Sequence, residues 1–465
     1  MKSKKLISLG IMAAMLTGMV LTGCGQSQQA GETTQGSSEA TETTESTSAE
    51  STAASGETVE LEFLFGDPNR TEIFSRIVDD FNNSQSAVHV TFNATGTNHL
   101  EELMTRLAAN DAPDMTSQLQ GYELASYVEA GYIKDIKDEP FMKYIRDTEL
   151  DTVTIDGGVY GIPMDTQAWG VFYNKELFDK AGISEVPTTV TELKDCVDKL
   201  KAAGITPFAA GYATEWTIGQ FLGYGASSIL TPAAVELGDN YKKGNWTFDQ
   251  PGIDQAFDVL DLVGDNTQDR PFDTDVSGQY ATFAKGDAAM MLQGNWSILQ
   301  IRELNPDIKM GMFPLPISDN ADDLLFPKQY GFVINVLKAS DEDPNKAAAI
   351  NQFMEYFLNP ENGGGYYYDE IGVPTANALA EPKLDEASEI LQQYLENEKT
   401  VFTYYAYEPA GFDAESWKVT VEYLNSGNKD HKKLIQNFND AFDKYADALE
   451  SVSYTHLTLP TTLRV

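Results

Sequence analysis

The stretch YGIPMDTQAWGVFYNKELFDKAGI, residues 160–183, contains a strand pattern followed directly by a helix pattern. The letters WGVFY (169–173) form a short apolar run that is typical of a buried strand. The letters NKELFDKAGI (174–183) have helical spacing, and Gly182 is placed to end that helix. The stretch therefore predicts one strand and helix of an α/β fold.

Strands and amphipathic helices alternate on both sides of this stretch. Toward the N-terminus, VELEFLF (59–65) precedes apolar residues at helical spacing over 73–81. Toward the C-terminus, YGFVINVLK (330–338) precedes NKAAAINQFMEYFL (345–358). Such alternation predicts doubly wound, mainly parallel sheets. Because residues 58–452 are too many for one hydrophobic core, we expect two lobes.

The first residues have the pattern of an export signal. Three lysines within the first five positions precede a largely apolar run over 6–21, which is short for a membrane span. The letters LTGC (21–24) follow and resemble a bacterial lipobox. We therefore expect residues 1–23 to be a lipoprotein signal peptide and Cys24 to be lipidated. A chance cysteine after an ordinary signal peptide is the alternative.

Two flanking segments are not expected to belong to the folded region. Residues 24–57 are rich in Ser, Thr and Glu, and beyond Cys24 they contain no Val, Ile, Leu, aromatic or basic residue. Such a segment cannot bury enough apolar surface to offset its chain entropy, so it predicts a disordered tether. The final letters SYTHLTLPTTLRV (453–465) break with the acidic helical pattern before them. We interpret them as a non-native tail.

Composition excludes some classes of function. The chain has 71 Asp and Glu against 32 Lys and Arg, a net charge of −39, which disfavours nucleic acid and anionic lipid as partners. The second of its two cysteines, Cys196, lies on the apolar face of a predicted helix and is expected to be a buried thiol. No GxSxG, GxxxxGK, HExxH or CxxC motif occurs. We therefore expect no enzyme activity, no metal and no cofactor, although a glycosidase needs only two carboxylates.

Six fragments in a fixed order resemble one protein family. The fragments are APDM (112–115), GYIKDI (131–136), the stretch 160–183, VPTTVTELKD (186–195), FAKGDAAMMLQGNW (283–296) and GVPT (372–375). Together they resemble family 1 of the extracellular solute-binding proteins, the sugar-binding lipoproteins of ABC importers related to maltose-binding protein. The resemblance extends over residues 58–450.

The resemblance implies two α/β lobes that are discontinuous in sequence and close on a ligand between them. It implies that the chain crosses between the lobes near 165–169, 325–330 and 360–367. The expected segments are 58–165 and 328–360 for the first lobe, and 168–325 and 367–452 for the second.

A neutral sugar has apolar ring faces and a rim of hydroxyls, so its site needs aromatic surfaces and hydrogen-bonding groups. By resemblance, the GNW turn lies at the cleft, where Gly294 allows close approach of the backbone and Trp296 forms a platform under a sugar ring. A core position is the alternative for Trp296. Trp417 is a second candidate platform, and Trp216 either lines the cleft or packs its own helix. Trp169 lies on a strand whose alternate residues face cleft and core.

Polar candidates follow several predicted strands. Asp67 is either a ligand contact or the N-cap of a helix. Gln120 and Tyr122 lie where the first lobe contacts sugar in related proteins, and Asp165 contacts ligand or braces the hinge. Gln167 replaces an acidic sugar contact of the maltose binder, so maltose specificity does not transfer. Tyr330 and Asp413 are further candidates.

These features together predict an extracytoplasmic, lipid-anchored and monomeric receptor that delivers a sugar or short oligosaccharide to an ABC permease. The same fold could bind a polyol or glycerol phosphate instead. An anionic ligand, however, would require converging cations, and only Arg70, Lys328 and Lys418 lie near the candidates. A surface hydrolase and a passive adhesin are the remaining alternatives.

Overall fold

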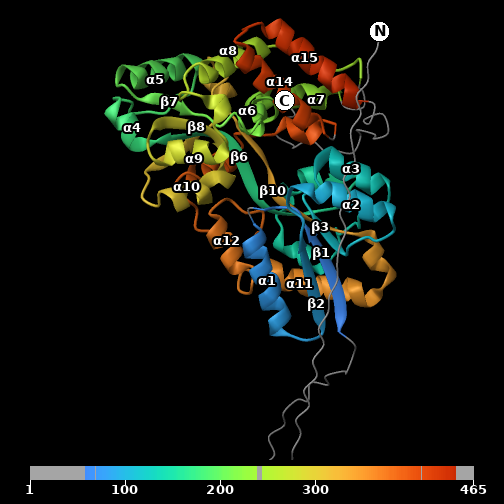
Figure 1. Ribbon diagram of the computed structural model, residues 1–465. Helices are drawn as coiled ribbons and strands as arrows, with labels where there is room; N and C mark the ends of the chain where they lie inside the picture. The colour runs from blue at the N-terminus through green and yellow to red at the C-terminus, as the bar shows by residue number, and fades with distance from the viewer. Residues whose placement is uncertain (1–57, 69, 238–242, 410, 447–465) are drawn as a thin grey trace, which may run out of the picture. The chain divides into compact units, whose positions relative to one another are not determined.

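The computed structural model describes residues 58–446, apart from residues 69, 238–242 and 410 (Figure 1). The predicted signal peptide, the lipidation site Cys24, the tether and the tail all lie outside the described residues. Within the described part, no helix is both long enough and apolar enough to cross a bilayer.

The described residues form a mixed sheet with helices packed around it (Figure 1). The strand order is β2-β1-β3-β10-β6-β8-β7, with β11 paired to β10 and β9 paired to β6. Strands β1, β2 and β3 are parallel to one another, as are β7 and β8, whereas the pairs that involve β6 run antiparallel. The strands are β1 Val59–Phe65, β2 Val88–Ala94, β3 Met115–Ser117, β6 Ile162–Asn174, β7 Thr206–Ala209, β8 Ala288–Gly294, β9 Met310–Phe313, β10 Phe326–Val336 and β11 Thr400–Phe402.

Helices account for most of the remaining described chain, and a separate hairpin pairs β4 (Thr154–Ile155) with β5 (Gly158–Val159). Short helical turns include the π-helix η5 (Phe221–Gly225) and the 3₁₀ turn η11 (Tyr404–Tyr407). The α-helices are α1 Thr71–Ser84, α2 His99–Ala108, α3 Gly121–Glu129, α4 Lys175–Lys180, α5 Val190–Ala202, α6 Trp216–Gln220, α7 Ser227–Leu237, α8 Ile253–Gly264, α9 Val276–Ala284, α10 Ile298–Leu304, α11 Pro344–Leu358, α12 Gly365–Ile371, α13 Glu389–Glu396, α14 Phe412–Ser426 and α15 His431–Tyr445.

The first half of the sheet, β2-β1-β3, is built as its sequence pattern predicts. The apolar residues of α1 that recur at helical spacing over 73–81 are all buried. Phe74 of α1 packs on Phe65, Phe332 and Phe357, with ring centroids 4.6 to 5.1 Å apart. These contacts join α1, β1, β10 and α11 in one core, so the end of β1 has a fixed position.

Strands β6 and β10 connect the two halves of the sheet. Residues 162–168 of β6 pair with β10, whereas residues 169–174 pair with β8 and β9. The pairing with β10 is irregular around Gly331, where a Cβ would lie only 2.2 Å from Oδ1 of Asp165. Nearly every residue of β6 is buried, as expected for a strand covered on both faces. The predicted α/β fold of two lobes around shared strands is confirmed by this topology.

A third segment runs beside β6, later in the chain than expected. Thr375 forms a bridge with Asp165, and the backbone N–H of Thr166 donates to the carbonyl of Pro374. The expected crossing at 360–367 instead leads into α12, whose Tyr367 packs on Phe74 with ring centroids 5.4 Å apart. The aromatic side chains of α12 therefore keep it with the first half.

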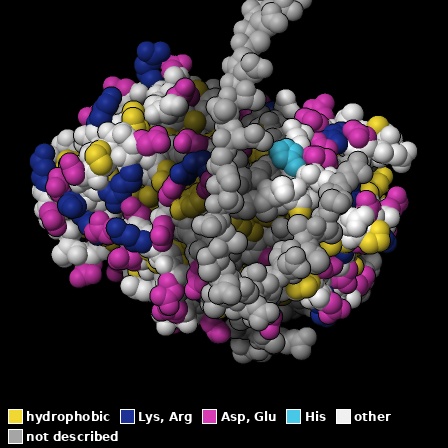
Figure 2. Space-filling model, turned by 90° about the horizontal axis from the view of Figure 1, so that it is seen from below, with side chains coloured by type: hydrophobic (Ala, Val, Ile, Leu, Met, Phe, Trp, Pro, Cys, Tyr) yellow, Lys and Arg dark blue, Asp and Glu magenta, His cyan; other side chains and the backbone are white. Residues whose placement is uncertain are grey.

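Charge is spread over the surface, and the unpaired cysteine is internal. On the face shown in Figure 2, Asp and Glu lie on both sides, whereas most of the visible Lys and Arg lie on its left side. Cys196 is a free, buried thiol, as predicted, and burial raises its pKa to about 12. A thiol with that pKa is protonated near neutral pH and is a poor nucleophile.

Candidate functional site

A cavity of about 710 Å³ lies beside the strands that the two halves share. One side is formed by residues at the end of β1, at the start of α2 and after β3, together with residues of β6 and β10. The other side is formed by α6, η5, α9, the turn after β8 and the start of α14. The lining residues are Gly66, Asp67, Pro68, Arg70, Gly96, His99, Leu100, Gln118, Gln167, Trp216, Gln220, Tyr224, Val276, Tyr280, Trp296, Gln300, Gln329, Gly331, Asp413 and Trp417.

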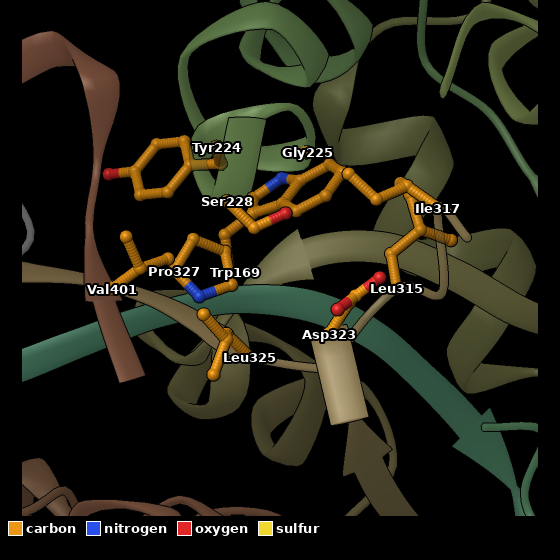
Figure 3. A pocket seen from close by; sticks show the side chains of 10 residues that line it. All are labelled: Trp169, Tyr224, Gly225, Ser228, Leu315, Ile317, Asp323, Leu325, Pro327 and Val401. Atoms are coloured by element: carbon orange, nitrogen blue, oxygen red, sulfur yellow. The ribbon is translucent and has the colours of Figure 1, made fainter. Parts of the chain in front are cut away.

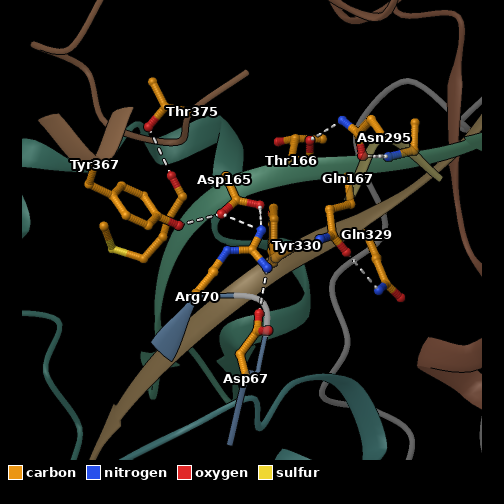
Figure 4. Close-up of polar contacts among 12 residues, drawn as sticks. Asp67, Arg70, Asp165, Thr166, Gln167, Asn295, Gln329, Tyr330, Tyr367 and Thr375 are labelled. Atoms are coloured by element: carbon orange, nitrogen blue, oxygen red, sulfur yellow. Dashed lines mark hydrogen bonds and ion pairs between the residues drawn. The ribbon is translucent and has the colours of Figure 1, made fainter. Parts of the chain in front are cut away.

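The first side, which we call the polar wall, is centred on a buried ion network of Asp67, Arg70, Asp165 and Tyr367 (Figure 4). Arg70 pairs with Asp67 and donates from Nη2 to both carboxylate oxygens of Asp165, at 2.9 and 3.0 Å. Tyr367 donates its hydroxyl to Asp165. Each of the four side chains is at most 6 % exposed. The network thus fixes the end of β1 to the shared strand β6.

Burial and neighbouring charges shift the pKa values of this network in opposite directions. Burial would lower the pKa of Arg70, but the charges of Asp165 and Asp67 outweigh burial and hold that pKa well above its usual value. Burial raises the pKa of Asp165, although Arg70 and Tyr367 partly offset the effect. The Nε–H of Arg70 is buried and has no hydrogen-bond partner among the described residues. The network therefore contains one buried donor that is not satisfied by a described residue.

The second side, which we call the aromatic wall, presents Trp216, Tyr224, Tyr280, Trp296 and Trp417. These side chains come from four separate segments, namely α6 with η5, α9, the turn after β8, and α14. Flat aromatic surfaces of this kind suit the apolar face of a sugar ring. The aromatic wall therefore supplies the stacking surfaces that the sequence predicted for a carbohydrate site.

The GNW turn places Trp296 in the cavity by two separate means. A Cβ at Gly294 would lie 2.0 Å from the indole of Trp296, so glycine allows the ring to fold back over its own backbone. Asn295 accepts from the backbone N–H of Ala168 and donates to the carbonyl of Thr166, at 3.2 and 3.3 Å (Figure 4). The amide therefore continues the pairing of β8 with β6 and fixes the turn.

Amide side chains supply most of the hydrogen-bonding groups between the two walls. Five glutamines line the cavity, and Gln167 and Gln329 lie on neighbouring strands, 3.5 Å apart (Figure 4). The Oε1 atom of Gln220 is buried without a hydrogen-bond partner among the described residues. Burial lowers the pKa of His99, so its ring is neutral at pH 7. The five glutamines are Gln118, Gln167, Gln220, Gln300 and Gln329.

The cavity has little positive charge to offer a ligand. Among the described lining residues, Asp67 and Asp413 are the carboxylates and Arg70 is the only cation, already paired with two carboxylates. Lys328 and Lys418 do not line the cavity. The Nζ atom of Lys328 lies 4.0 Å from Oε2 of Glu149. The side chain of Lys418 is 53 % exposed. This arrangement suits an uncharged ligand better than an anion.

The cavity brings together half of the predicted site residues. Its lining includes Asp67, Gln167, Trp216, Trp296, Asp413 and Trp417. The residue directly before α1 is Arg70, whose backbone N–H donates to the carbonyl of Asp67, so Asp67 lies at the start of the helix as well as in the cavity lining. The core alternative for Trp296 is wrong, since its ring is only partly buried and lines the cavity.

The other predicted residues support the cavity from behind. Gln120 bonds to the carbonyl of Tyr330, and Tyr122 packs on Tyr407. Trp169 is fully buried beneath Tyr224, because η5 covers β6 at that point. Asp165 and Tyr330 are also buried, and Gly294 acts through Trp296. These six residues do not line the cavity.

Several lining residues had no prediction from the sequence. Gln118 directly follows β3, so it could have been predicted by the same rule as the other polar candidates that follow a strand. It has a φ of 73°, which turns the chain before α3. Tyr224 and Tyr280 lie within helices, where their spacing is the same as that of core residues. Among the described residues, no group of three or more His, Cys, Asp or Glu side chains is placed to hold a metal ion.

Comparisons with known proteins give one consistent family of relatives. Residues 67–364 match the family model described as bacterial extracellular solute-binding protein. A multiple sugar-binding protein of Streptococcus mutans is 24 % identical over 255 residues, which cover 52 % of this chain and 58 % of that protein. The maltodextrin-binding protein MdxE of Bacillus subtilis is 25 % identical over 321 residues, covering 63 % of this chain and 69 % of MdxE.

A solved structure shows the same fold. The apo form of RafE from Streptococcus pneumoniae superposes with a TM-score of 0.70 at 23 % identity. The match covers 84 % of this chain and 99 % of RafE. The chain thus covers nearly all of RafE, whereas it spans little more than half the length of the Streptococcus mutans protein, at 58 %.

Proposed function

Because the chain belongs to the family of bacterial extracellular solute-binding proteins, we propose that it captures a sugar or short oligosaccharide between its two walls. The observation that carries this proposal is the meeting of three indole rings with five amide side chains around one cavity. Indole faces can stack on pyranose rings, while amides both donate to and accept from hydroxyls. Relatives named as binders of maltodextrin and of multiple sugars support the same ligand class.

A polyol or glycerol phosphate is the alternative ligand within the fold. A phosphate group would require unpaired cations or a cluster of backbone N–H donors. Arg70 is already paired with two carboxylates, and Asp413 adds a further acidic group to the lining. The charge of the cavity therefore favours a neutral saccharide.

The wider role follows from the family and from the N-terminal pattern. We infer that Cys24 carries lipid, that residues 24–57 act as a tether, and that the monomer delivers its ligand to an ABC permease. We also propose that the two lobes have the boundaries given by the resemblance, except that the third crossing lies at about 372–385 and not at 360–367. This change is supported by α12, which packs on α1, and by the ion pair of Arg302 with Asp385.

A thermal-shift screen of the purified chain tests the proposal. Maltotriose, raffinose and their monosaccharides should raise the unfolding midpoint, since a ligand at 100 times its Kd adds about 2.7 kcal/mol. Trp296→Phe should reduce that shift. The matched control Trp246→Phe, at a buried site packed on Tyr404, should not.

The alternatives give different results in the same experiments. Glycerol phosphate that shifts the midpoint while saccharides do not would replace the carbohydrate proposal. Release of reducing sugar during incubation would indicate a hydrolase. An unchanged scattering radius with a bound saccharide would contradict closure of the lobes.

A further inference from the structure

The two central tryptophans of the aromatic wall are connected through a pair of tyrosines. The indole Nε1–H of Trp417 donates to the hydroxyl of Tyr405 at 2.8 Å. The ring of Tyr405 meets the ring of Tyr224 edge-on, with centroids 5.2 Å apart. Tyr224 in turn contacts Trp296, with centroids 5.7 Å apart. A chain of four aromatic residues therefore links α14 to the turn after β8.

The π-helix η5 holds the middle of this chain. The carbonyl of Gly223 accepts hydroxyl bonds from Thr403 at 2.6 Å and from Ser227 at 2.5 Å. The bond from Thr403 attaches the segment before Tyr405 to η5. A Cβ at Gly223 would lie 2.2 Å from the Tyr405 ring, so the ring fills the space that this glycine leaves open. π-helical turns often occur at functional sites, and this one determines where Tyr405 lies.

Trp417, at one end of this chain, and Tyr224, next to the other end, each have fixed support. A Cβ at Gly219 of α6 would lie 2.4 Å from Cβ of Trp417, so glycine allows α6 and α14 to approach closely. Tyr224 stacks on the buried Trp169 with centroids 6.1 Å apart, next to a hollow of only about 10 Å³ (Figure 3). Such a hollow is barely large enough for one water molecule. Tyr224 therefore has little room to move.

The tryptophans also differ in what they can offer a ligand. The indole N–H of Trp417 is already bonded to Tyr405. Neither Trp216 nor Trp296 donates its indole N–H to any described residue, although both line the same cavity. Trp417 can therefore contact a ligand by stacking, and the quality of that stacking depends on the angle of its ring.

We propose that Tyr405 is a positioning residue, whose hydroxyl sets the angle of Trp417 and whose ring, through Tyr224, holds Trp296 in a fixed relation to it. The inference rests on the proposed function, in which both indoles stack on one saccharide. Tyr405 itself does not line the cavity and so acts through its neighbours.

The five indole N–H signals of ¹⁵N-labelled protein test the inference without ligand. Tyr405→Phe removes only the hydroxyl, so it should move the Trp417 signal and leave that of Trp296 in place. Tyr405→Leu also removes the ring, so it should move both signals. The control Tyr212→Phe, which removes a buried hydroxyl without a described partner, should move neither. An unmoved Trp417 signal in Tyr405→Phe, or an unmoved Trp296 signal in Tyr405→Leu, would overturn the inference.

Affinity for maltotriose and raffinose, measured by calorimetry, gives the functional result. Tyr405→Phe should weaken binding about fivefold, the effect of one lost neutral hydrogen bond. Tyr405→Leu should weaken it about thirtyfold, because both rings lose their support. Wild-type affinity in both variants would contradict the positioning role. Failure of wild type to bind any saccharide would instead count against the proposed function, while the indole signals still decide this inference.

Discussion

The two walls of the cavity are held in place by different forces. The polar wall depends on charges, because Arg70 joins Asp67 to Asp165 inside the protein, where water cannot replace a lost partner. The aromatic wall depends on ring packing around Tyr224 and the supporting Tyr405, with one hydrogen bond, from Trp417 to Tyr405, within this group of described rings. Substitutions in the polar wall should therefore mainly lower the free energy of unfolding. Substitutions in the aromatic wall should mainly lower ligand affinity.

The largest expected effect comes from Arg70→Met. This change leaves Asp67 and Asp165 buried without their cation, so it should lower the free energy of unfolding by about 3–5 kcal/mol. Urea denaturation measures the loss. The control Arg76→Met breaks an exposed pair with Glu370 and should cost less than about 1 kcal/mol. Equal losses in the two variants would contradict the importance of the buried network.

A pH effect is expected where α3 of the first half faces α14 of the second. Burial and the charge of Asp413 raise the pKa of Glu123 from 4.5 to about 7. Tyr127 also faces Glu123, and Glu408 faces Asp413. Because the folded pKa is raised, the stabilisation is complete below pH 4.5 and is lost as the pH rises through 7.

The variant Glu123→Gln isolates this effect. Glu123 should account for about 2 kcal/mol of the unfolding free energy that wild type loses between pH 5 and pH 8, so Glu123→Gln should reduce that slope by about this amount. The control Glu129→Gln, at an exposed site of the same helix, should keep it. Denaturation midpoints across this range give the measurement, and parallel slopes for wild type and Glu123→Gln would refute the prediction.

Trp296→Ala should mainly affect binding. Loss of a central aromatic surface is expected to weaken affinity for a bound saccharide about thirtyfold, or about 2 kcal/mol. The unfolding free energy should change less than in Arg70→Met, because the ring is only partly buried. Calorimetry and urea denaturation together separate the two quantities. A variant that unfolds readily but keeps its affinity would reverse the contrast between the walls.

Gly294→Ala should give the smallest of these effects. The new Cβ would lie 2.0 Å from the Trp296 ring and force it to rotate, while a φ of −91° is unstrained for alanine. We therefore expect affinity to fall about fivefold with little change in the midpoint of unfolding. The double variant with Trp296→Ala should bind no more weakly than Trp296→Ala alone, since the ring that Gly294 accommodates is then absent.

Much of the fold follows from local patterns in the sequence. VELEFLF coincides with β1 at Val59–Phe65, and the apolar run at 288–292 lies within β8. NKAAAINQFMEYFL lies within α11 at Pro344–Leu358. The stretch TIGQFLGYGASSIL (217–230), however, contains the π-helix Phe221–Gly225, which its local apolar pattern does not distinguish from an α-helix. Its carbonyl at Gly223 bonds to Thr403, far away in sequence, so no local pattern could reveal it.

By itself, the sequence determined the α/β class, the strands that run through both halves, and the presence of aromatic and amide groups after strands. Tertiary structure alone decided which of these groups reach the cavity. Trp169 of β6 pairs with Gly294 at the end of β8, and Trp296 lies two residues further on, yet η5 covers Trp169 and leaves Trp296 partly exposed. The physical reason is that periodicity records the face of a strand on which a side chain lies, whereas exposure depends on which distant segment packs over that face.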